Sequence, residues 1–236
     1  MKAAVVYEFG KPLTLEDVDI AEPGKGEIKI KVKATAICHS DIHDWKAEMP
    51  GGVPFIGGHE TAGYVEKVGA GVTSVKIGDP VVVSLLAHCG KCYYCITGLP
   101  HLCEHRFDPP RNPRVKNKKG QTLDLKGNIG GFAEYVVVDE SQVVKLPKDM
   151  ALDRASLLAC GVITGFGGVV NRAKVRPFSF LATLFMESTR ASGIGTMNSS
   201  PILNRVLPPR TTISPSIRFI GGSPTRFPTK SVPGEL

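Results

Sequence analysis

Four cysteines lie within fifteen residues, in the stretch CGKCYYCITGLPHLC, and they are Cys89, Cys92, Cys95 and Cys103. Thiolates three residues apart on a tight turn can bind one ion at about 2.3 Å, and a fourth thiolate completes a tetrahedron. Four sulfur ligands leave no open position for a substrate. The spacing therefore predicts a structural zinc ion in a lobe over about residues 88–104. An iron–sulfur cluster or free thiols remain the alternatives.

Three histidines flank this lobe, at His88, His101 and His105. Sulfur already fills a tetrahedral shell, so these side chains are expected to be solvated loop residues and not ligands.

The other two cysteines stand far apart, and the histidine of a Gly-Gly-His-Glu stretch lies between them. Cys38 opens CHSDIH, His59 lies in GGHE and Cys160 follows LLA. Together they would form a Cys₂His ligand set with an open fourth position, which is typical of a catalytic zinc ion. The alternative for Cys160 is a small buried apolar side chain in a helix, and a single Gly-His-Glu is a weak signal.

Short strands separated by glycine turns are predicted to position these residues. GEIKIKVKATAI alternates, with Ile28, Ile30 and Val32 on one face and lysines on the other, which indicates a half-buried strand. AGYVEKVGAGV, VKIGDPVVV and GGFAEYVVVDESQVVKLP continue the pattern. Many short strands with glycine-rich turns suggest a mainly β chain that forms a partly open barrel. A polar loop is expected over about residues 105–128.

The chain changes character in its last quarter. ALDRASLLACGVITGFGGVVNRAKV, residues 151–175, is the first convincing helical stretch, with glycines that kink it. From about residue 177 onward, prolines, serines and arginines dominate and no period is sustained. We predict two regions, a catalytic-type domain over 1–170 and a basic, mostly disordered tail over 171–236.

These motifs together resemble the zinc-dependent medium-chain alcohol dehydrogenase family over roughly residues 1–176. The resemblance rests on pieces in family order and at family spacing, namely the four-cysteine lobe and CHSDIH, GGHETAGYVEKVGAGVTSVKIGD, GGFAEYVVV and LLACGVITGFGGVVNRAKV. It implies a GroES-like catalytic domain, two zinc ions per chain and NAD(P) as cofactor. The implied reaction converts an alcohol to an aldehyde or ketone through a zinc-bound alkoxide. Such proteins are usually oligomeric.

The resemblance also implies residue roles. Cys38, His59 and Cys160 become the ligands of a catalytic zinc ion, which acts as a Lewis acid on the alcohol. Ser40 would hydrogen-bond the substrate oxygen and pass on its proton. His43 would end this relay at solvent, the alternative being an ordinary surface histidine.

Further roles fall on neighbouring positions. Glu60 would lie behind the zinc ion as an outer group or transient ligand, and Asp41 would orient His59 through its other ring nitrogen. His39 matches a position that often contacts cofactor phosphate, and Thr164 one near the nicotinamide. Trp45 would line the alcohol pocket or serve as a structural residue.

The family's glycine-rich cofactor turn does not follow. After AKVRP the nearest candidate is SGIGTMNS, residues 192–199, with Asn198 in place of the third glycine. We therefore expect the Rossmann cofactor domain to be essentially missing, through truncation, frameshift or fusion near residue 177. The alternative to a working dehydrogenase is then a catalytically inactive zinc-binding remnant.

Net charge and hydropathy limit which classes of partner and which cellular location we expect for this chain. The formal net charge of +7 arises entirely after residue 170, where nine basic residues face two acidic ones. The tail has no basic run and little interleaving of aromatic with basic residues for base stacking, so nucleic-acid binding is not expected. No apolar window reaches the roughly 18 residues of a membrane span, and the start lacks a signal pattern. We expect a cytoplasmic chain that acts on a small alcohol or aldehyde.

Overall fold

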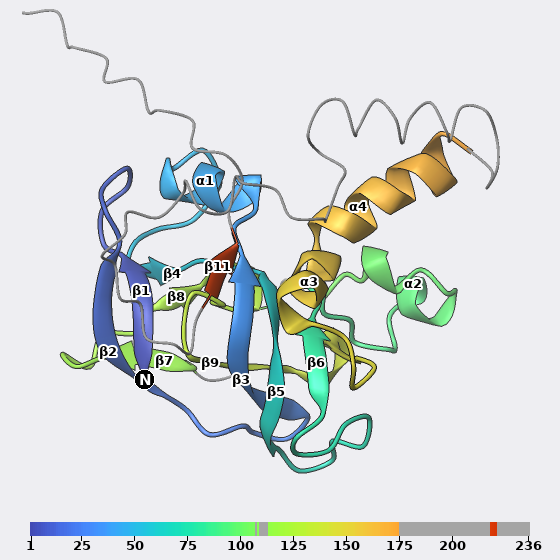
Figure 1. The fold of residues 1–236 in the computed structure, drawn as a ribbon, viewed down its shortest axis with the longest axis horizontal. Helices are drawn as coiled ribbons and strands as arrows, with labels where there is room; N and C mark the ends of the chain where they lie inside the picture. Colours follow the sequence, from blue (N-terminus) through green and yellow to red (C-terminus); the bar gives the residue numbers. More distant parts are fainter. Residues whose placement is uncertain (107, 109–112, 175–217, 221–236) are drawn as a thin grey trace, which may run out of the picture.

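The computed structural model describes residues 1–106, 108, 113–174 and 218–220. Most of these residues form two β-sheets (Figure 1). One sheet has the strand order β7-β2-β1-β4-β8. Its strands are β1 (Lys2–Val6), β2 (Thr14–Ile20), β4 (Phe55–Ile56), β7 (Val115–Asn117) and β8 (Asp124–Leu125). This sheet carries the amino terminus.

The second sheet has the order β10-β6-β5-β3-β11, with β9 also paired to β3. Its central strand β3 is ten residues long and shows the predicted alternation, because Ile28, Ile30 and Val32 are fully buried while the intervening lysines reach solvent. The strands are β3 (Glu27–Ala36), β5 (Glu60–Val68), β6 (Pro80–Val83), β9 (Tyr135–Asp139), β10 (Val143–Lys145) and β11 (Arg218–Ile220).

Backbone hydrogen bonds join the two sheets. The Ala4 N–H donates to the Phe132 carbonyl at 2.8 Å, and the Glu134 N–H donates to the Lys2 carbonyl at 3.0 Å. The segment that ends in β9 therefore continues from one sheet to the other. Each sheet has its own cluster of buried apolar side chains. This arrangement confirms the prediction of a mainly β chain with a partly open barrel.

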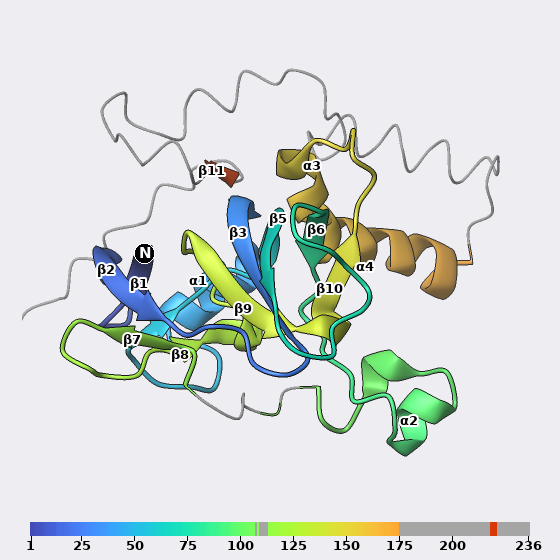
Figure 2. The ribbon, with the colours of Figure 1, turned by 90° about the horizontal axis from the view of Figure 1, so that it is seen from below.

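Short helices lie around the sheets (Figure 2). The α-helices are α1 (His39–Trp45), α2 (Tyr93–Ile96), α3 (Leu152–Ser156) and α4 (Gly161–Gly167). Single 3₁₀ turns cover η1 (Pro100–Leu102), η2 (Lys126–Asn128), η3 (Glu140–Gln142) and η4 (Leu157–Ala159), and a π-helical turn, η5 (Gly168–Arg172), extends α4.

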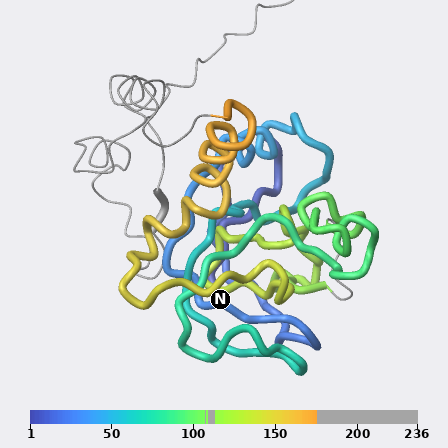
Figure 3. Tube along the Cα trace, turned by 90° about the vertical axis from the view of Figure 1, so that its right-hand side faces the viewer, coloured from blue at the N-terminus to red at the C-terminus, as the bar shows by residue number. Residues whose placement is uncertain are grey.

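The predicted helical stretch is present, but its main break lies at Cys160. The backbone there has φ −143° and ψ −70°, so η4 ends and α4 starts in a new direction. Helix α3 packs through Ala155 on Ala62 and Val82 of the second sheet. Helix α4 and η5 project beyond the sheets on one side (Figure 1), and in the view from that side they lie at the top of the trace (Figure 3).

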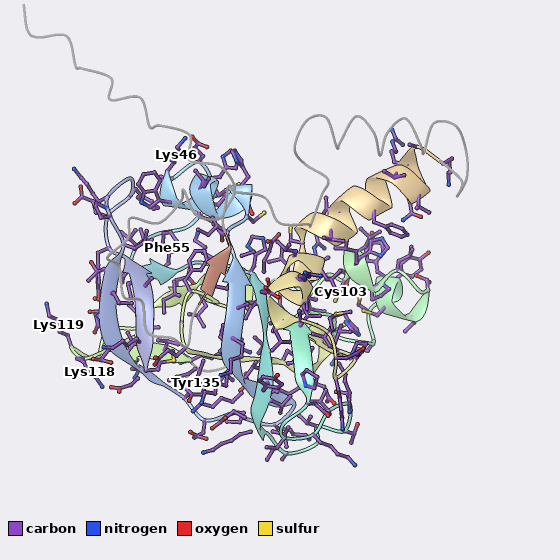
Figure 4. The ribbon with its side chains drawn as sticks, in the orientation of Figure 1. Lys46, Phe55, Cys103, Lys118, Lys119 and Tyr135 are labelled. Atoms are coloured by element: carbon purple, nitrogen blue, oxygen red, sulfur yellow. The ribbon has the colours of Figure 1, made fainter. Side chains whose placement is uncertain are left out.

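The prediction of a polar loop over residues 105–128 was wrong in part, because β7 and β8 lie within that range. Val115 and Asn117 are buried against β2, and Lys116 between them faces solvent. The turn that follows carries Lys118, which pairs with Asp19 of β2, and Lys119 (Figure 4). A strand of three residues beside a lysine-rich turn is too short to show its alternation in the sequence.

The predicted disordered tail falls mainly outside the described residues, as does the SGIGTMNS stretch. Within that tail the structure describes residues 171–174 and the strand β11, which the sequence did not predict. Among the described residues no single helix is long and apolar enough to cross a membrane. Leu152–Ala159 and Gly161–Arg172 pass that test only as a pair, by length and composition, and the pair is bent by 53°.

Candidate functional site

The four lobe cysteines converge around one point. Cys92 Sγ lies 3.5 Å from Cys95 Sγ and 3.8 Å from Cys103 Sγ, and Cys89 Sγ lies 4.0 Å from Cys95 Sγ. A tetrahedral ion bound at about 2.3 Å needs sulfurs about 3.8 Å apart. These distances therefore fit a single tetrahedral ion, whereas a multi-iron cluster would hold its ligands farther apart. Figure 4 places Cys103 beside α2.

Backbone groups of the lobe are arranged to stabilise thiolates. The N–H groups of Cys89 and His105 each donate to Cys103 Sγ at 3.3 Å, and the Cys92 N–H donates to Cys89 Sγ at 3.3 Å. Hydrogen bonds from the backbone of Glu104 and Cys95 lower the pKa of Cys92 to about 6. The charge of a thiolate is thus partly compensated before any ion binds.

The three lobe histidines lie outside this cluster. All of them are exposed, and His105 Nδ1 pairs with Asp108 Oδ2 at 2.9 Å. The structure therefore gives them no place among the four sulfurs. None of the six cysteines forms a disulfide.

The second cluster forms where three separate segments meet. Cys38 precedes the first turn of α1, His59 lies just before β5, and Cys160 lies at the break before α4. Cys38 Sγ and Cys160 Sγ are 3.8 Å apart, and ligand atoms of these three residues and Glu60 all lie within 4.8 Å of one another. The predicted ligand set is therefore brought together, with Glu60 beside it.

Asp41 ties two of these segments to each other. Its Oδ2 accepts the Cys38 N–H at 2.9 Å, and its Oδ1 accepts the Gly58 N–H at 3.0 Å. The same Oδ1 lies 3.3 Å from His59 Nδ1. Since Nδ1 faces Asp41, Nε2 is left to face the cluster, where it lies 3.5 Å from Ser40 Oγ. Asp41 therefore lies where it could orient His59 through its other ring nitrogen, and that role stays a prediction.

Glu60 is buried beside the cluster and is held by a hydrogen bond from the backbone of the Cys160 segment. It is 3% exposed, and its Oε1 accepts the Gly161 N–H at 2.8 Å. Burial raises the pKa of Glu60. Gly161 follows Cys160, so this bond also fixes the third ligand segment to the second. The sequence did not predict this role of Gly161, because the bond uses a backbone N–H, which almost every residue type has.

The remaining predicted residues lie on the exposed faces of α1 and α4. His39 and His43 stack edge to face with ring centroids 4.7 Å apart, and His43 Nδ1 contacts Glu48 Oε2. Thr164 is exposed on α4. Trp45 donates its indole N–H to the Lys11 carbonyl at 2.6 Å, which favours its structural reading.

An apolar cavity of about 610 Å³ opens beside Cys160 and Thr164. The sequence did not indicate its other walls, which come from β6, the segment after it, β10 and the helical stretch. They are Val82, Ser84, Leu85, Leu86, Val144, Leu146, Leu158, Ala159, Val162, Ile163 and Phe166. The cluster therefore has apolar surface on one side, as a site for an organic molecule requires.

The metal-free cluster retains protons that an ion must displace. Burial lowers the pKa of His59, but its hydrogen bond and charge interaction with Asp41, together with Cys38, outweigh burial and raise that pKa to about 9. Burial and the neighbouring Cys38 raise the pKa of Cys160 to about 11. Protonated His59 therefore stabilises the metal-free fold below about pH 6.5, and this contribution is lost as the pH rises toward 9.

Zinc binding at this cluster should consequently release protons at pH 7.5, including one each from His59 and Cys160. Affinity should rise with pH, most steeply up to about 9, where both ligands are protonated, and further toward about 11, the pKa of Cys160. Titration calorimetry in buffers of different ionisation enthalpy measures the release. The Cys160→Ser variant supplies the background from the cysteine lobe. Equal proton release in both chains would contradict this assignment.

Gly58 is placed where a side chain cannot fit. Its φ is +88°, and an added Cβ would lie 2.6 Å from Phe132 Cδ1 and 2.8 Å from the Phe132 nitrogen. We expect Gly58→Ala to lower the free energy of unfolding by about 2 kcal/mol or more. Urea denaturation would measure the loss. Gly52→Ala is the matched control, since nothing lies within 4 Å of that position. Equal effects of both substitutions would refute the packing argument.

With this geometry in place, comparison with known proteins identifies the family. The family model for the alcohol dehydrogenase GroES-like domain matches residues 24–148, just over half of the chain. The chain belongs to this family. The match includes Cys38, His59 and the whole cysteine lobe.

Relatives in the alcohol dehydrogenase family support the assignment. "Putative alcohol dehydrogenase D" of Mycobacterium tuberculosis is 40% identical over 179 residues, which are 74% of this chain and 49% of the relative. An alcohol dehydrogenase zinc-binding domain protein from Burkholderia ambifaria has a TM-score of 0.70 at 32% identity, covering 74% of this chain and 49% of that one. Benzyl alcohol dehydrogenase from Acinetobacter calcoaceticus has a TM-score of 0.66 at 33% identity, over 75% and 49%.

The chain spans about half the length of the relatives it matches. The comparisons confirm the family resemblance and the GroES-like fold inferred from the sequence. Within the described residues there is no doubly wound parallel sheet of the Rossmann type.

Proposed function

We propose that this chain supplies the metal-binding catalytic half of an alcohol dehydrogenase, which oxidises an alcohol to an aldehyde or ketone with NAD(P) or runs the reverse reaction. The observation that carries the proposal is the meeting of Cys38, His59 and Cys160. Two sulfurs 3.8 Å apart and a buried imidazole with Nε2 facing them suit zinc, and three protein ligands leave one position for a substrate.

Zinc bound there would supply Lewis-acid chemistry that makes an alcohol hydroxyl more acidic. The protein's own groups would do the rest. Ser40 Oγ, 3.5 Å from His59 Nε2, lies close enough to the cluster to hydrogen-bond the substrate hydroxyl and relay its proton, releasing its own Oγ proton in turn. His43 lies nearer solvent, held by Glu48, and would pass the proton outward.

The buried acids would set the electrostatics of the site. Asp41 holds His59 with Nε2 toward the cluster and keeps the Cys38 segment in register. Glu60, bound by the Gly161 N–H and with a carboxylate oxygen within 4.8 Å of the other ligand atoms, would serve as an outer group or a transient ligand of the ion. We propose that the cysteine lobe holds a second, structural zinc ion, and that His39 and Thr164 lie toward the cofactor.

The second candidate is a zinc-binding module without turnover. It is favoured by one observation of the sequence, that SGIGTMNS, the nearest glycine-rich stretch after the matched domain, has Asn198 in place of the third glycine. The first candidate predicts saturable NADH binding, and the second predicts none.

An NADH fluorescence titration of the full, zinc-loaded chain separates the two, with zinc counted on the same sample. Two zinc ions per chain with saturable NADH binding would support the dehydrogenase. Two zinc ions without NADH binding would support the inactive module. Fewer than two zinc ions per chain would refute the metal content that both candidate functions assume.

A further inference from the structure

One edge of β3 is shared by two different strands. β5 pairs with β3 from Ile28 to Ala36, so β9 and β11 must share the opposite edge. β9 pairs with Glu27–Lys31, and the Val32 N–H donates to the Glu134 carbonyl at 2.9 Å. In the part of the chain that is described, the last three residues of β3 on this edge are paired with β11 alone.

This end of β3 lies in the interior of the protein. Ala34 is 2% exposed, Thr35 0% and Ala36 1%. Buried backbone N–H and C=O groups without partners are costly, and an open strand edge is a template for another strand. The edge therefore requires an extended partner, and the carboxyl-terminal segment supplies one.

The same end of β3 leads directly into the metal-ligand cluster. Ala36 lies two residues before Cys38, and on its other side it pairs with Glu60, which follows His59. A fixed register here sets the positions of Cys38 and His59 relative to each other. Ile220 of β11 pairs with Ala36 from the free edge, so β11, β3 and β5 form a three-strand ladder at the base of the cluster.

The occupying segment suits this position by its sequence and its distance along the chain. β11 runs parallel to β3, and a parallel pair needs a long connection. The 43 residues between Lys174 and Arg218 provide it. The strand Arg-Phe-Ile contains two good strand formers, and a Gly-Gly pair follows it in the sequence. Figure 2 shows β11 beside the end of β3.

We propose that residues 218–220 are a docking strand that closes the free edge of β3 at Ala34–Ala36 and thereby holds the Cys38 segment in position for metal binding. The occupant is the chain's own carboxyl-terminal segment. The docking itself does not depend on metal binding, and only its effect at Cys38 rests on the proposed function.

Hydrogen–deuterium exchange on the full, metal-free chain tests the docking. Neighbouring residues of a strand direct their N–H groups to opposite edges, so at least one of Phe219→Pro and Ile220→Pro removes a ladder donor. We expect amides of residues 34–37 to exchange on the order of tenfold faster in that variant. Thr212→Pro, six residues before β11 in the sequence, is the matched control and should leave them unchanged. Unchanged exchange in both strand variants would overturn the proposal.

Zinc release to a chelator tests the effect at Cys38. The more affected variant should lose zinc from the Cys38 cluster on the order of tenfold faster, while release from the cysteine lobe stays constant. Faster amide exchange with unchanged zinc release would overturn the link to the cluster and leave the docking intact. Protection that depends on protein concentration would overturn the assignment to the chain's own segment, because a second copy would then donate the strand.

Discussion

Replacing Cys103 with serine should remove one zinc ion per chain and unfold the cysteine lobe while both sheets persist. Cys103 is fully buried, and its sulfur accepts N–H groups from Cys89 and His105. The lobe has little else to hold it, since α2 has four residues and the large apolar side chains around it are exposed. Where a segment lacks a core, the free energy of metal binding is its folding free energy.

Zinc counting and limited proteolysis measure this outcome. Zinc should fall from two ions per chain to one, with new cleavage between residues 88 and 104. Cys160→Ser is the matched control, because it should also remove one ion while the lobe stays resistant to protease. A Cys103→Ser chain that retains both ions, or an intact lobe after loss of one, would contradict the structural role.

Replacing Asp41 with alanine should weaken zinc binding at the Cys38 cluster by about 10- to 100-fold. The substitution removes the acceptor for the Cys38 and Gly58 N–H groups and the partner of His59 Nδ1. His59 would lose the contact that directs Nε2 toward the cluster. Its pKa should also fall from about 9, since Asp41 is the main group that raises it.

Competition with a chromophoric chelator measures the affinity of the two sites separately. Asp44→Ala is the matched control, because Asp44 lies in the same helix but pairs with Lys126 at 3.1 Å. Asp41→Asn keeps an acceptor without the charge and should lie between alanine and the wild type. An Asp41→Ala chain with unchanged affinity would show that the ligands are positioned without it.

The sequence predicted the parts of the molecule that are specified by local pattern and residue type. The alternation of β3 follows from a period of two, and the cysteine spacing follows from what a short turn can bring together. Cys38, His59 and Cys160 needed the family resemblance, because nothing in the local sequence says that residues so far apart will meet. The structure brings them together, and their role as zinc ligands stays a prediction.

The features that the sequence missed depend on distant backbone partners. β7 is visible only through its pairing with β2, and β11 only through its pairing with β3. The bond between Glu60 and Gly161 joins residues 101 positions apart and uses an N–H that every residue except proline has. Such contacts are set by the tertiary fold, so neither the local periodicity of apolar residues nor a residue type predicts them.

The separation of the metal ligands along the chain has a thermodynamic consequence. Cys38 and Cys160 are 122 positions apart, so an ion bound between them closes a loop that contains most of the two sheets. Closing a loop of that length removes much of the configurational entropy of an unfolded chain that keeps the ion, by analogy with a cross-link. Zinc bound there would act as a reversible cross-link that stabilises the whole barrel. The melting temperature of the sheets would then rise with the free zinc concentration.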